Sequence, residues 1–268
     1  KSLLLSAGLT VSALCWTLLL QAGSYTGGRL TLSVLDVGQG LSTAVYSQGA
    51  SALVDCGGSG LDDAGDTAAD YFQALGLSRI DVVALTHYHP DHANGVARLL
   101  ERMEVGLLIL PDVEPEDPLR RSILALAEEK GVDTLLVADV TTLTLGGAEL
   151  TIYPPLGAGD ANEEGLSVLC TAGEFDALIT GDMDEIIEGR LLKYGNLPDL
   201  EALVVGHHGS KYSTSEELLL AARPELAVIS VGYNTYGHPA PETLERLAAA
   251  GCQIYRTDWS GTITITSE

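Results

Sequence analysis

The sequence predicts an α+β protein in which two β-sheets lie back to back and helices cover both outer faces. Thirty glycines separate short runs rich in valine, isoleucine and leucine, a pattern typical of a strand-rich protein. A group of strands comes before alternating strands and helices, and this order occurs twice along the chain. About 240 residues follow an apolar N-terminal stretch, which is enough for one large domain with a full core.

The first half of the domain is expected to begin with a strand meander. Short apolar or alternating runs predict its strands, and apolar side chains at helical spacing predict the helix that follows the first histidines. The predicted strands cover residues 30–37, 41–46, 52–54, 80–85, 105–110 and 134–137, and the predicted helices cover 67–75, 96–103 and 119–129.

The second half repeats this order, since a run of strands again precedes alternating helices and strands. The predicted strands cover residues 148–153, 166–170, 175–180, 202–205 and 226–231, followed by a pair of strands that ends at Ile265. The predicted helices begin at Asp184, Ser215 and Pro241.

Residues 1–24 are predicted to form a transmembrane helix or membrane anchor, and residues 29–268 the domain. No charged side chain occurs between residues 2 and 28, and the apolar part is long enough to cross a hydrocarbon layer as a helix. A cleaved signal peptide with Lys1 as its basic flank is the alternative. Because the chain begins with lysine, we expect an excerpt of a longer membrane protein in which this is the last membrane-spanning helix.

Composition narrows the function classes. The formal net charge of −23 argues against a module that wraps duplex nucleic acid, because such modules present a basic face. Cysteines are spaced too widely for a zinc knuckle or a redox pair. One disulfide between Cys170 and Cys252 is an alternative to buried free thiols.

All six histidines lie in three short motifs, which predicts a metal site. Residues two apart in an extended segment point the same way, so His87 and His89 can hold one ion together. Asp91 and His92 lie at the turn into the next helix and face a neighbouring ion. One hexapeptide can therefore serve two divalent cations about 4 Å apart, with zinc or manganese as the candidates.

Two further predicted strands end in residues of the ligand type. The strand at 175–180 ends at Gly181-Asp182, and an Asp182 carboxylate at that edge of the sheet could bridge both ions. The strand at 202–205 ends just before His207 and His208. We expect these side chains to converge with the first histidine motif at one rim of the sandwich.

These motifs resemble the metallo-β-lactamase superfamily, which implies a four-layer αβ/βα sandwich with a dinuclear metal site. The resemblance extends to the hydrolase domain of ComEC-type DNA-uptake channel proteins, in which such a domain follows a transmembrane bundle. It covers residues 30–265. The motifs that carry it are His87-x-His89-x-Asp91-His92, Gly181-Asp182, Leu35-Asp36-Val37-Gly38-Gln39-Gly40, Val54-Asp55-Cys56-Gly57-Gly58, His207-His208-Gly209-Ser210 and Gly237-His238-Pro239.

The resemblance also implies a role for each candidate residue. The metal ligands would be His87, His89, Asp91, His92, Asp182 and His208. His207 would contact metal or phosphate, and His238 would donate a proton to the leaving group or contact the substrate. Asp55 and Asp36 would orient the histidine loop through hydrogen bonds, and Ser210 and Lys211 would contact phosphate. The catalytic residues would be Asp91, His207 and His238.

One feature departs from the wider superfamily. Many members have another metal-binding histidine between the hexapeptide and the Gly-Asp motif, whereas no histidine lies between His92 and His207 here. Asn162, Glu163, Glu164 or water could stand in for it. A site with fewer imidazoles makes manganese a serious competitor to zinc.

The expected function is metal-assisted hydrolysis of a phosphodiester. The resemblance implies a nuclease at the cell membrane, part of a larger channel protein, acting on the extracytoplasmic side on the DNA strand that is not imported. Single-stranded DNA fits the acidic composition better than a duplex does. The alternatives are a hydrolase of small phosphoesters such as phosphorylcholine esters, a β-lactam or thioester hydrolase, and a non-catalytic binding module that retains metal.

Overall fold

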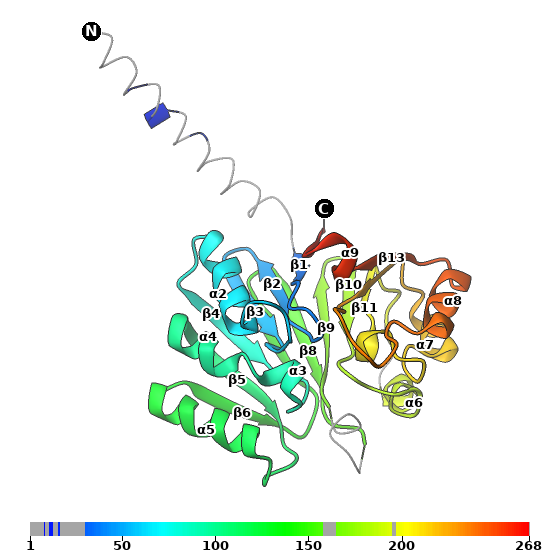
Figure 1. Cartoon of the computed structure of the whole chain (residues 1–268), viewed down its shortest axis with the longest axis horizontal. Coiled ribbons are helices and arrows are strands. Elements are labelled where there is room, and N and C mark those ends of the chain that lie inside the picture. Colours follow the sequence, from blue (N-terminus) through cyan, green and yellow to red (C-terminus); the bar gives the residue numbers. More distant parts are fainter. Residues whose placement is uncertain are drawn as a thin grey trace.

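The computed structural model describes residues 30–157, 165–194 and 197–267, together with the isolated positions 8, 11, 12 and 16. In this part of the chain two seven-stranded sheets face each other, and helices cover the outer faces (Figure 1). The strand orders are β14-β1-β2-β3-β4-β5-β6 and β13-β12-β11-β10-β9-β8-β7. The predicted four-layer sandwich is therefore confirmed.

The first sheet is mixed, because an antiparallel meander is followed by parallel strands. Helices α2 to α5 belong to this half. The strands are β1 (Thr31–Val34), β2 (Thr43–Ser47), β3 (Ala50–Val54), β4 (Arg79–Ala84), β5 (Glu104–Pro111), β6 (Asp133–Val137) and β14 (Ile263–Thr266). The helices are α2 (Ala64–Ala74), α3 (Pro90–Ala93), α4 (Val96–Arg102) and α5 (Pro118–Lys130).

The second sheet is mixed in the same way, with antiparallel β7 to β10 and parallel β10 to β13. Its strands are β7 (Thr141–Leu145), β8 (Ala148–Tyr153), β9 (Ser167–Ala172), β10 (Phe175–Ile179), β11 (Ala202–Val204), β12 (Leu226–Ile229) and β13 (Gln253–Arg256). The helices are α6 (Glu185–Tyr194), α7 (Glu216–Ala222), α8 (Pro241–Ala249) and the short α9 (Thr257–Ser260), and a 3-10 turn, η1, covers Gly206–Gly209.

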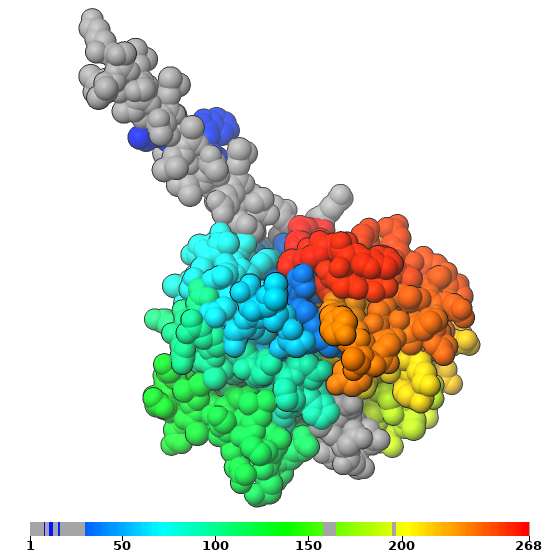
Figure 2. Space-filling view, in the orientation of Figure 1, coloured from blue at the N-terminus to red at the C-terminus, as the bar shows by residue number. Residues whose placement is uncertain are grey.

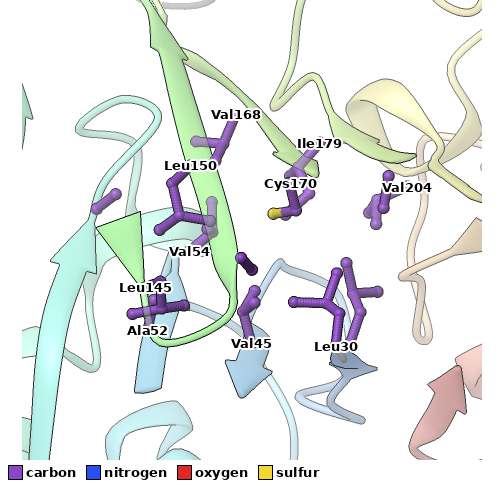
Figure 3. Packing of buried hydrophobic residues seen from close by; sticks show 14 of the residues in the cluster. Leu30, Val45, Ala52, Val54, Leu145, Leu150, Val168, Cys170, Ile179 and Val204 are labelled. Atoms are coloured by element: carbon purple, nitrogen blue, oxygen red, sulfur yellow. The ribbon is translucent and has the colours of Figure 1, made fainter. Parts of the chain in front are cut away.

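The main core lies between the two sheets, and strand alternation produces it. In β1, Leu32 and Val34 face the opposite sheet, and in β10, Ala177 and Ile179 do the same. Leu178 lies between the last two and packs against the helices of its own half instead. Figure 3 shows side chains of both sheets meeting in this inner layer. Burial on both faces explains why the central strands read as continuous apolar runs.

The last two strands differ from a simple pair. β13 joins the second sheet beside β12, with Tyr255 opposite Val228, while β14 joins the first sheet beside β1, with Ile265 opposite Leu32. The helical turn α9 and Gly261, whose φ is +68°, carry the chain from one sheet to the other. The C-terminal strand thus ties the two halves together.

The predicted membrane segment, residues 1–24, lies outside the described residues except for four isolated positions. Within the described part of the chain, no helix combines the length and the apolar character needed to cross a membrane. The cysteines that the structure describes, Cys56, Cys170 and Cys252, are buried free thiols. The disulfide between Cys170 and Cys252 is therefore not formed.

Candidate metal centre

The predicted site residues lie in loops at one edge of the sandwich. Those loops follow β4 in the first sheet and β10, β11 and β12 in the second, and α3 opens directly after the β4 loop. In Figure 1, α3 lies at the junction of the two halves. In chain order these segments carry His87, His89, Asp91 and His92, then Asp182, then His207 and His208, and finally His238.

Four side chains bring their donor atoms together. One donor atom each from Asp91, His92, Asp182 and His208 lies within 4.8 Å of the other three. Nε2 of His92 is 3.0 Å from Oδ1 of Asp182, and Nε2 of His208 is 3.5 Å from Oδ2 of Asp91. Two donors held about 2.1 Å from one ion stand about 3.0–3.4 Å apart. These two closest pairs have about the spacing of ligands around a single cation.

The two oxygens of Asp182 face different groups of imidazoles. Oδ1 lies toward His92 at 3.0 Å and His208 at 3.9 Å. Oδ2 lies toward His207 at 3.5 Å and His87 at 3.9 Å, in each case measured to Nε2. The Asp182 carboxylate thus presents one acceptor oxygen to each of two groups of imidazoles.

Several of these donor atoms are buried and unpaired. Among the described residues, Nε2 of His87, His92 and His208 and Oδ1 of Asp182 have no hydrogen-bond partner. His92 and Asp182 are close enough for a hydrogen bond but not aligned for one. Unsatisfied buried polar atoms are costly, and native proteins rarely leave several together. Imidazole and carboxylate donors converging on one space therefore fit divalent cations.

Hydrogen bonds behind the rings hold Nε2 of two histidines toward this space. Nδ1 of His92 donates to Oδ2 of Asp55 at 2.7 Å. The Thr86 hydroxyl also donates to that oxygen, at 2.7 Å, and lies 3.0 Å from Nδ1 of His87, which donates to it. The Thr86 amide donates to the other Asp55 oxygen at 2.6 Å. One buried carboxylate thus orients two imidazoles, which is the role predicted for Asp55.

The turn after β11 presents two adjacent histidines to the site. His207 and His208 have φ values of +49° and +53°, in the left-handed region that non-glycine residues seldom adopt. Nδ1 of His208 donates to the Ser230 carbonyl at 2.9 Å, and the Ser230 hydroxyl donates to the Gly40 carbonyl at 2.6 Å. This unusual backbone turns both rings toward Asp182 instead of sending them to opposite sides.

The carboxylates and imidazoles of the pocket shift one another's pKa values. Burial lowers the pKa of His92, but the Asp182 and Asp55 carboxylates outweigh burial and hold this pKa well above its ordinary value. Burial raises the pKa of the Asp182 carboxyl, but the imidazoles of His92 and His208 outweigh burial and hold this pKa well below its usual range. Burial and the nearby His92 keep the pKa of His87 well below its ordinary value, so its ring is neutral and can donate a lone pair.

The remaining histidines lie around this cluster. The ring of His89 is exposed and stands edge-on to His87, with centroids 4.8 Å apart. The half-buried His238 stands edge-on to His207 at 5.5 Å. Burial and the neighbouring imidazoles lower the pKa of His238. Both rings therefore border the cluster from its open side.

For three predicted residues the structure shows local contacts within their own loops. Asp36 is exposed and its carboxylate accepts from the Gly38 amide in its own loop, so it caps a turn and does not reach the histidine loop. The Ser210 hydroxyl is buried and accepts from the Tyr212 amide, and the Lys211 ammonium lies 4.8 Å from the centre of the Tyr212 ring. The suggested stand-ins at residues 162–164 lie outside the described residues.

Sequence reasoning missed two residues that orient histidines. Thr86 connects Asp55 to His87, and its only signal is that it directly precedes the first histidine at the end of a buried strand. Ser230 orients His208 through its backbone carbonyl, which every residue type has, so residue identity carries no signal there.

Comparisons with known proteins agree with this geometry. The sequence pattern of the metallo-β-lactamase superfamily matches residues 35–233. ComE operon protein 3 of Bacillus subtilis is 31% identical over 72% of this chain and 25% of its own length. Competence protein ComA of Neisseria gonorrhoeae is 31% identical over 92% of this chain and 35% of its own length.

Solved structures agree on the fold. The metallo-β-lactamase fold protein YhfI from Bacillus subtilis superposes with a TM-score of 0.60 at 14% identity, covering 88% of this chain and 99% of its own. At that identity the likeness concerns the fold alone. The chain spans about a quarter to a third of the two competence proteins, so it matches one part of each.

Proposed function

Because the chain belongs to the metallo-β-lactamase superfamily, we propose that its hydrolase site cleaves phosphodiesters and acts as an extracytoplasmic nuclease on the DNA strand that is not imported during DNA uptake. The observation that carries this proposal is the division of the Asp182 oxygens between two groups of imidazoles. The similarity to two competence proteins supports DNA as the substrate. In this proposal residues 29–268 are the hydrolase domain of a larger membrane channel protein, anchored by residues 1–24.

Two divalent ions, zinc or manganese, fit the donors present. Asp91, His92 and His208 would hold one ion together with Oδ1 of Asp182. His87, His89 and His207 would hold the other together with Oδ2 of the same carboxylate. His207 then supplies an imidazole on the side where the superfamily's usual histidine between residues 92 and 182 is missing. When bound, such ions supply Lewis acidity at the phosphate and lower the pKa of the attacking water.

The protein's own residues position the substrate. Asp91 is partly exposed. Burial would raise the pKa of its carboxyl, but the nearby imidazoles of His208 and His92 lower that pKa to about 2. Its carboxylate therefore remains an acceptor at neutral pH. His238 is neutral there because its pKa is lowered. We assign His238 to a hydrogen bond with the substrate rather than to proton donation.

The test is a substrate panel. The 268-residue chain is incubated with manganese or zinc and with labelled single-stranded DNA, duplex DNA and a chromogenic small phosphodiester. The proposal predicts cleavage of single-stranded DNA that depends on added metal and stops with chelator. Hydrolysis of the small ester alone would replace the nuclease with a small-phosphoester hydrolase. Metal bound without any turnover would favour a binding module.

A further inference from the structure

A groove of about 400 Å³ opens beside Asp91, between the loop after β12 and the start of α3. Its volume is in the range of small-ligand sites. Tyr233, Asn234 and Tyr236 line it on one side, and Pro90 and Asp91 line it on the other. None of its lining residues is lysine or arginine. The groove therefore offers aromatic and neutral polar surface next to a predicted metal ligand.

Two tyrosine rings dominate the exposed wall of this groove. Tyr233 is 93% exposed and Tyr236 is 76% exposed, and the two residues belong to one short loop. In Figure 2 the orange segment that contains this loop borders the blue and teal segments on the face shown. Most of the surface of both side chains is therefore open to a flat partner from solvent.

A line of aromatic rings connects this wall to the side chains around Asp182. The ring of Tyr236 lies 5.8 Å from that of His238 at a tilt of 34°, and His238 lies 5.5 Å from His207. Nε2 of His207 is 3.5 Å from Oδ2 of Asp182. A ligand held by the tyrosines would thus lie directly beside the reacting centre.

The loop that carries the rings is held by one side chain. Oδ1 of Asn234 accepts from the amides of Tyr236, Gly237 and His238 at 3.0–3.1 Å. Its Nδ2 donates to the carbonyls of Gly232 and His238 at 2.9 and 2.8 Å. Five hydrogen bonds from one residue keep the loop backbone in place, so little conformational entropy is lost when a ligand binds.

Resting on the proposed nuclease function, we propose that Tyr233 and Tyr236 form a stacking platform for unpaired bases of single-stranded DNA whose backbone passes the Asp182 cluster. Stacking on aromatic side chains accepts every base, because each base has a π face. Stacking is also compatible with the strongly negative net charge of the chain. Since the groove has no cationic side chain, affinity must come from the bases and not from release of phosphate counterions.

The platform also selects the form of the strand. Bases in a duplex are already stacked and paired, and exposing one face to a tyrosine costs a few kcal/mol. Unpaired bases have no such cost. The same groove therefore discriminates between single-stranded and duplex DNA without reading any sequence.

The test measures binding rather than cleavage. The 268-residue chain is kept in chelator, and its affinity for a short fluorescent single-stranded oligonucleotide is compared with that for an abasic strand with the same phosphates. We expect the intact strand to bind more tightly than the abasic one. Tyr233→Ala and Tyr236→Ala should each weaken binding of the intact strand about fivefold or more, whereas Tyr233→Phe and Tyr236→Phe should retain it. Tyr255→Ala, which removes a 40% exposed ring on β13, is the matched control.

Two results would overturn the platform: equal affinity for intact and abasic strands, or unchanged affinity in a double variant that combines Tyr233→Ala with Tyr236→Ala. Neither result touches the nuclease proposal, which is tested separately by metal-dependent cleavage of DNA. If the platform binds single strands but the metal-loaded protein cleaves none, the proposed function fails and the platform stands as a binding site.

Discussion

Nδ1 of His92 lies 2.7 Å from Oδ2 of Asp55, and both side chains are fully buried. The same ring turns its Nε2 toward Asp182 at 3.0 Å. A carboxylate behind a metal-ligating imidazole sets its tautomer and raises its basicity. Asp55 accepts two more hydrogen bonds from Thr86. It is therefore an acceptor for three donors, and it is the residue on which the orientation of the first motif depends.

Replacing Asp55 with asparagine should weaken metal binding about 10- to 100-fold. The amide would present a donor to a position where Thr86 or His92 already donates, so one of these bonds must break. Titration of the chain with zinc or manganese against a competing chelator measures the effect. Asp36→Asn is the control, because Asp36 caps a turn away from the cluster. Unchanged affinity in the Asp55 variant would refute its role in orienting the ligands.

Replacing Asp182 with asparagine should reduce metal content and hydrolytic activity together. The amide nitrogen cannot act as a ligand, so one of the two groups of imidazoles loses its shared carboxylate oxygen. Elemental analysis of the purified variant measures bound metal for each protein chain. Asp133→Asn, on the exposed edge strand β6, should match the original protein. Full metal content and activity in the Asp182 variant would exclude that carboxylate from the site.

The succession of strands along the chain and the gathering of ligand-type residues at strand ends could be predicted because they depend on local patterns. Apolar runs such as β10 end at glycine or at polar residues, and the same strand ends carry the ligand side chains. The positions of Ser210 and Lys211 could not be predicted in this way. Both residues follow the left-handed turn at His207 and His208, and the Ser210 hydroxyl accepts from the Tyr212 amide. That turn is a property of the assembled sheet and not of the motif.

The groove beside Asp91 could not be predicted from the sequence either. Tyr233 and Tyr236 look like ordinary loop residues until Asn234 is seen to accept from three successive backbone amides. The opposite wall comes from residues far away in the chain, at the start of α3. Tertiary contacts between two halves of the sandwich create this surface, so no spacing within either segment indicates it.

Gly57 should not tolerate a side chain. A Cβ there would lie 2.4 Å from the backbone nitrogen of His92 and 2.5 Å from the carbonyl carbon of Asp91. Because backbone cannot move aside cheaply, Gly57→Ala should lower the free energy of unfolding by about 1–3 kcal/mol and weaken metal binding. Denaturant unfolding and chelator competition measure both effects.

Gly189 provides the matched control for Gly57. It lies inside α6, where a Cβ would meet nothing closer than 3.9 Å. Gly189→Ala should therefore raise the free energy of unfolding by about 0.5–1 kcal/mol, since alanine favours a helix. If both alanine variants shift stability in the same direction, close backbone approach is not the reason for glycine at position 57.

The domain boundary is open to a deletion test. The buried residues of the three described core clusters all lie between Leu30 and Ile263. Removal of residues 1–24 should therefore leave a domain that unfolds cooperatively and binds metal with unchanged affinity. Circular dichroism during denaturation and metal titration measure this. Aggregation of the shortened chain would show that the apolar stretch is part of the fold.

Glu188 in α6 is not a predicted metal ligand, and its titration should make the free energy of unfolding depend on pH. Its carboxylate accepts from the Thr214 amide at 2.6 Å and the Ser215 amide at 2.8 Å. Burial raises the pKa of Glu188 from 4.5 to about 7, although these amides and the Arg246 guanidinium favour the ionised form. The folded protein therefore binds this proton more tightly than the unfolded chain does.

The sign of the effect follows from that difference. The contribution of Glu188 is fully present below pH 4.5 and is lost as pH rises through about 7, a change of about 3 kcal/mol at most. Glu188→Gln removes the titration. The free energy of unfolding of the variant, minus that of the original protein, should therefore increase from pH 5 to pH 8. Urea unfolding at several pH values measures this difference. Glu185→Gln changes an exposed carboxylate in the same helix and should leave the pH profile as it is. A Glu188→Gln profile parallel to that of the original protein would mean that the carboxylate is ionised throughout this range.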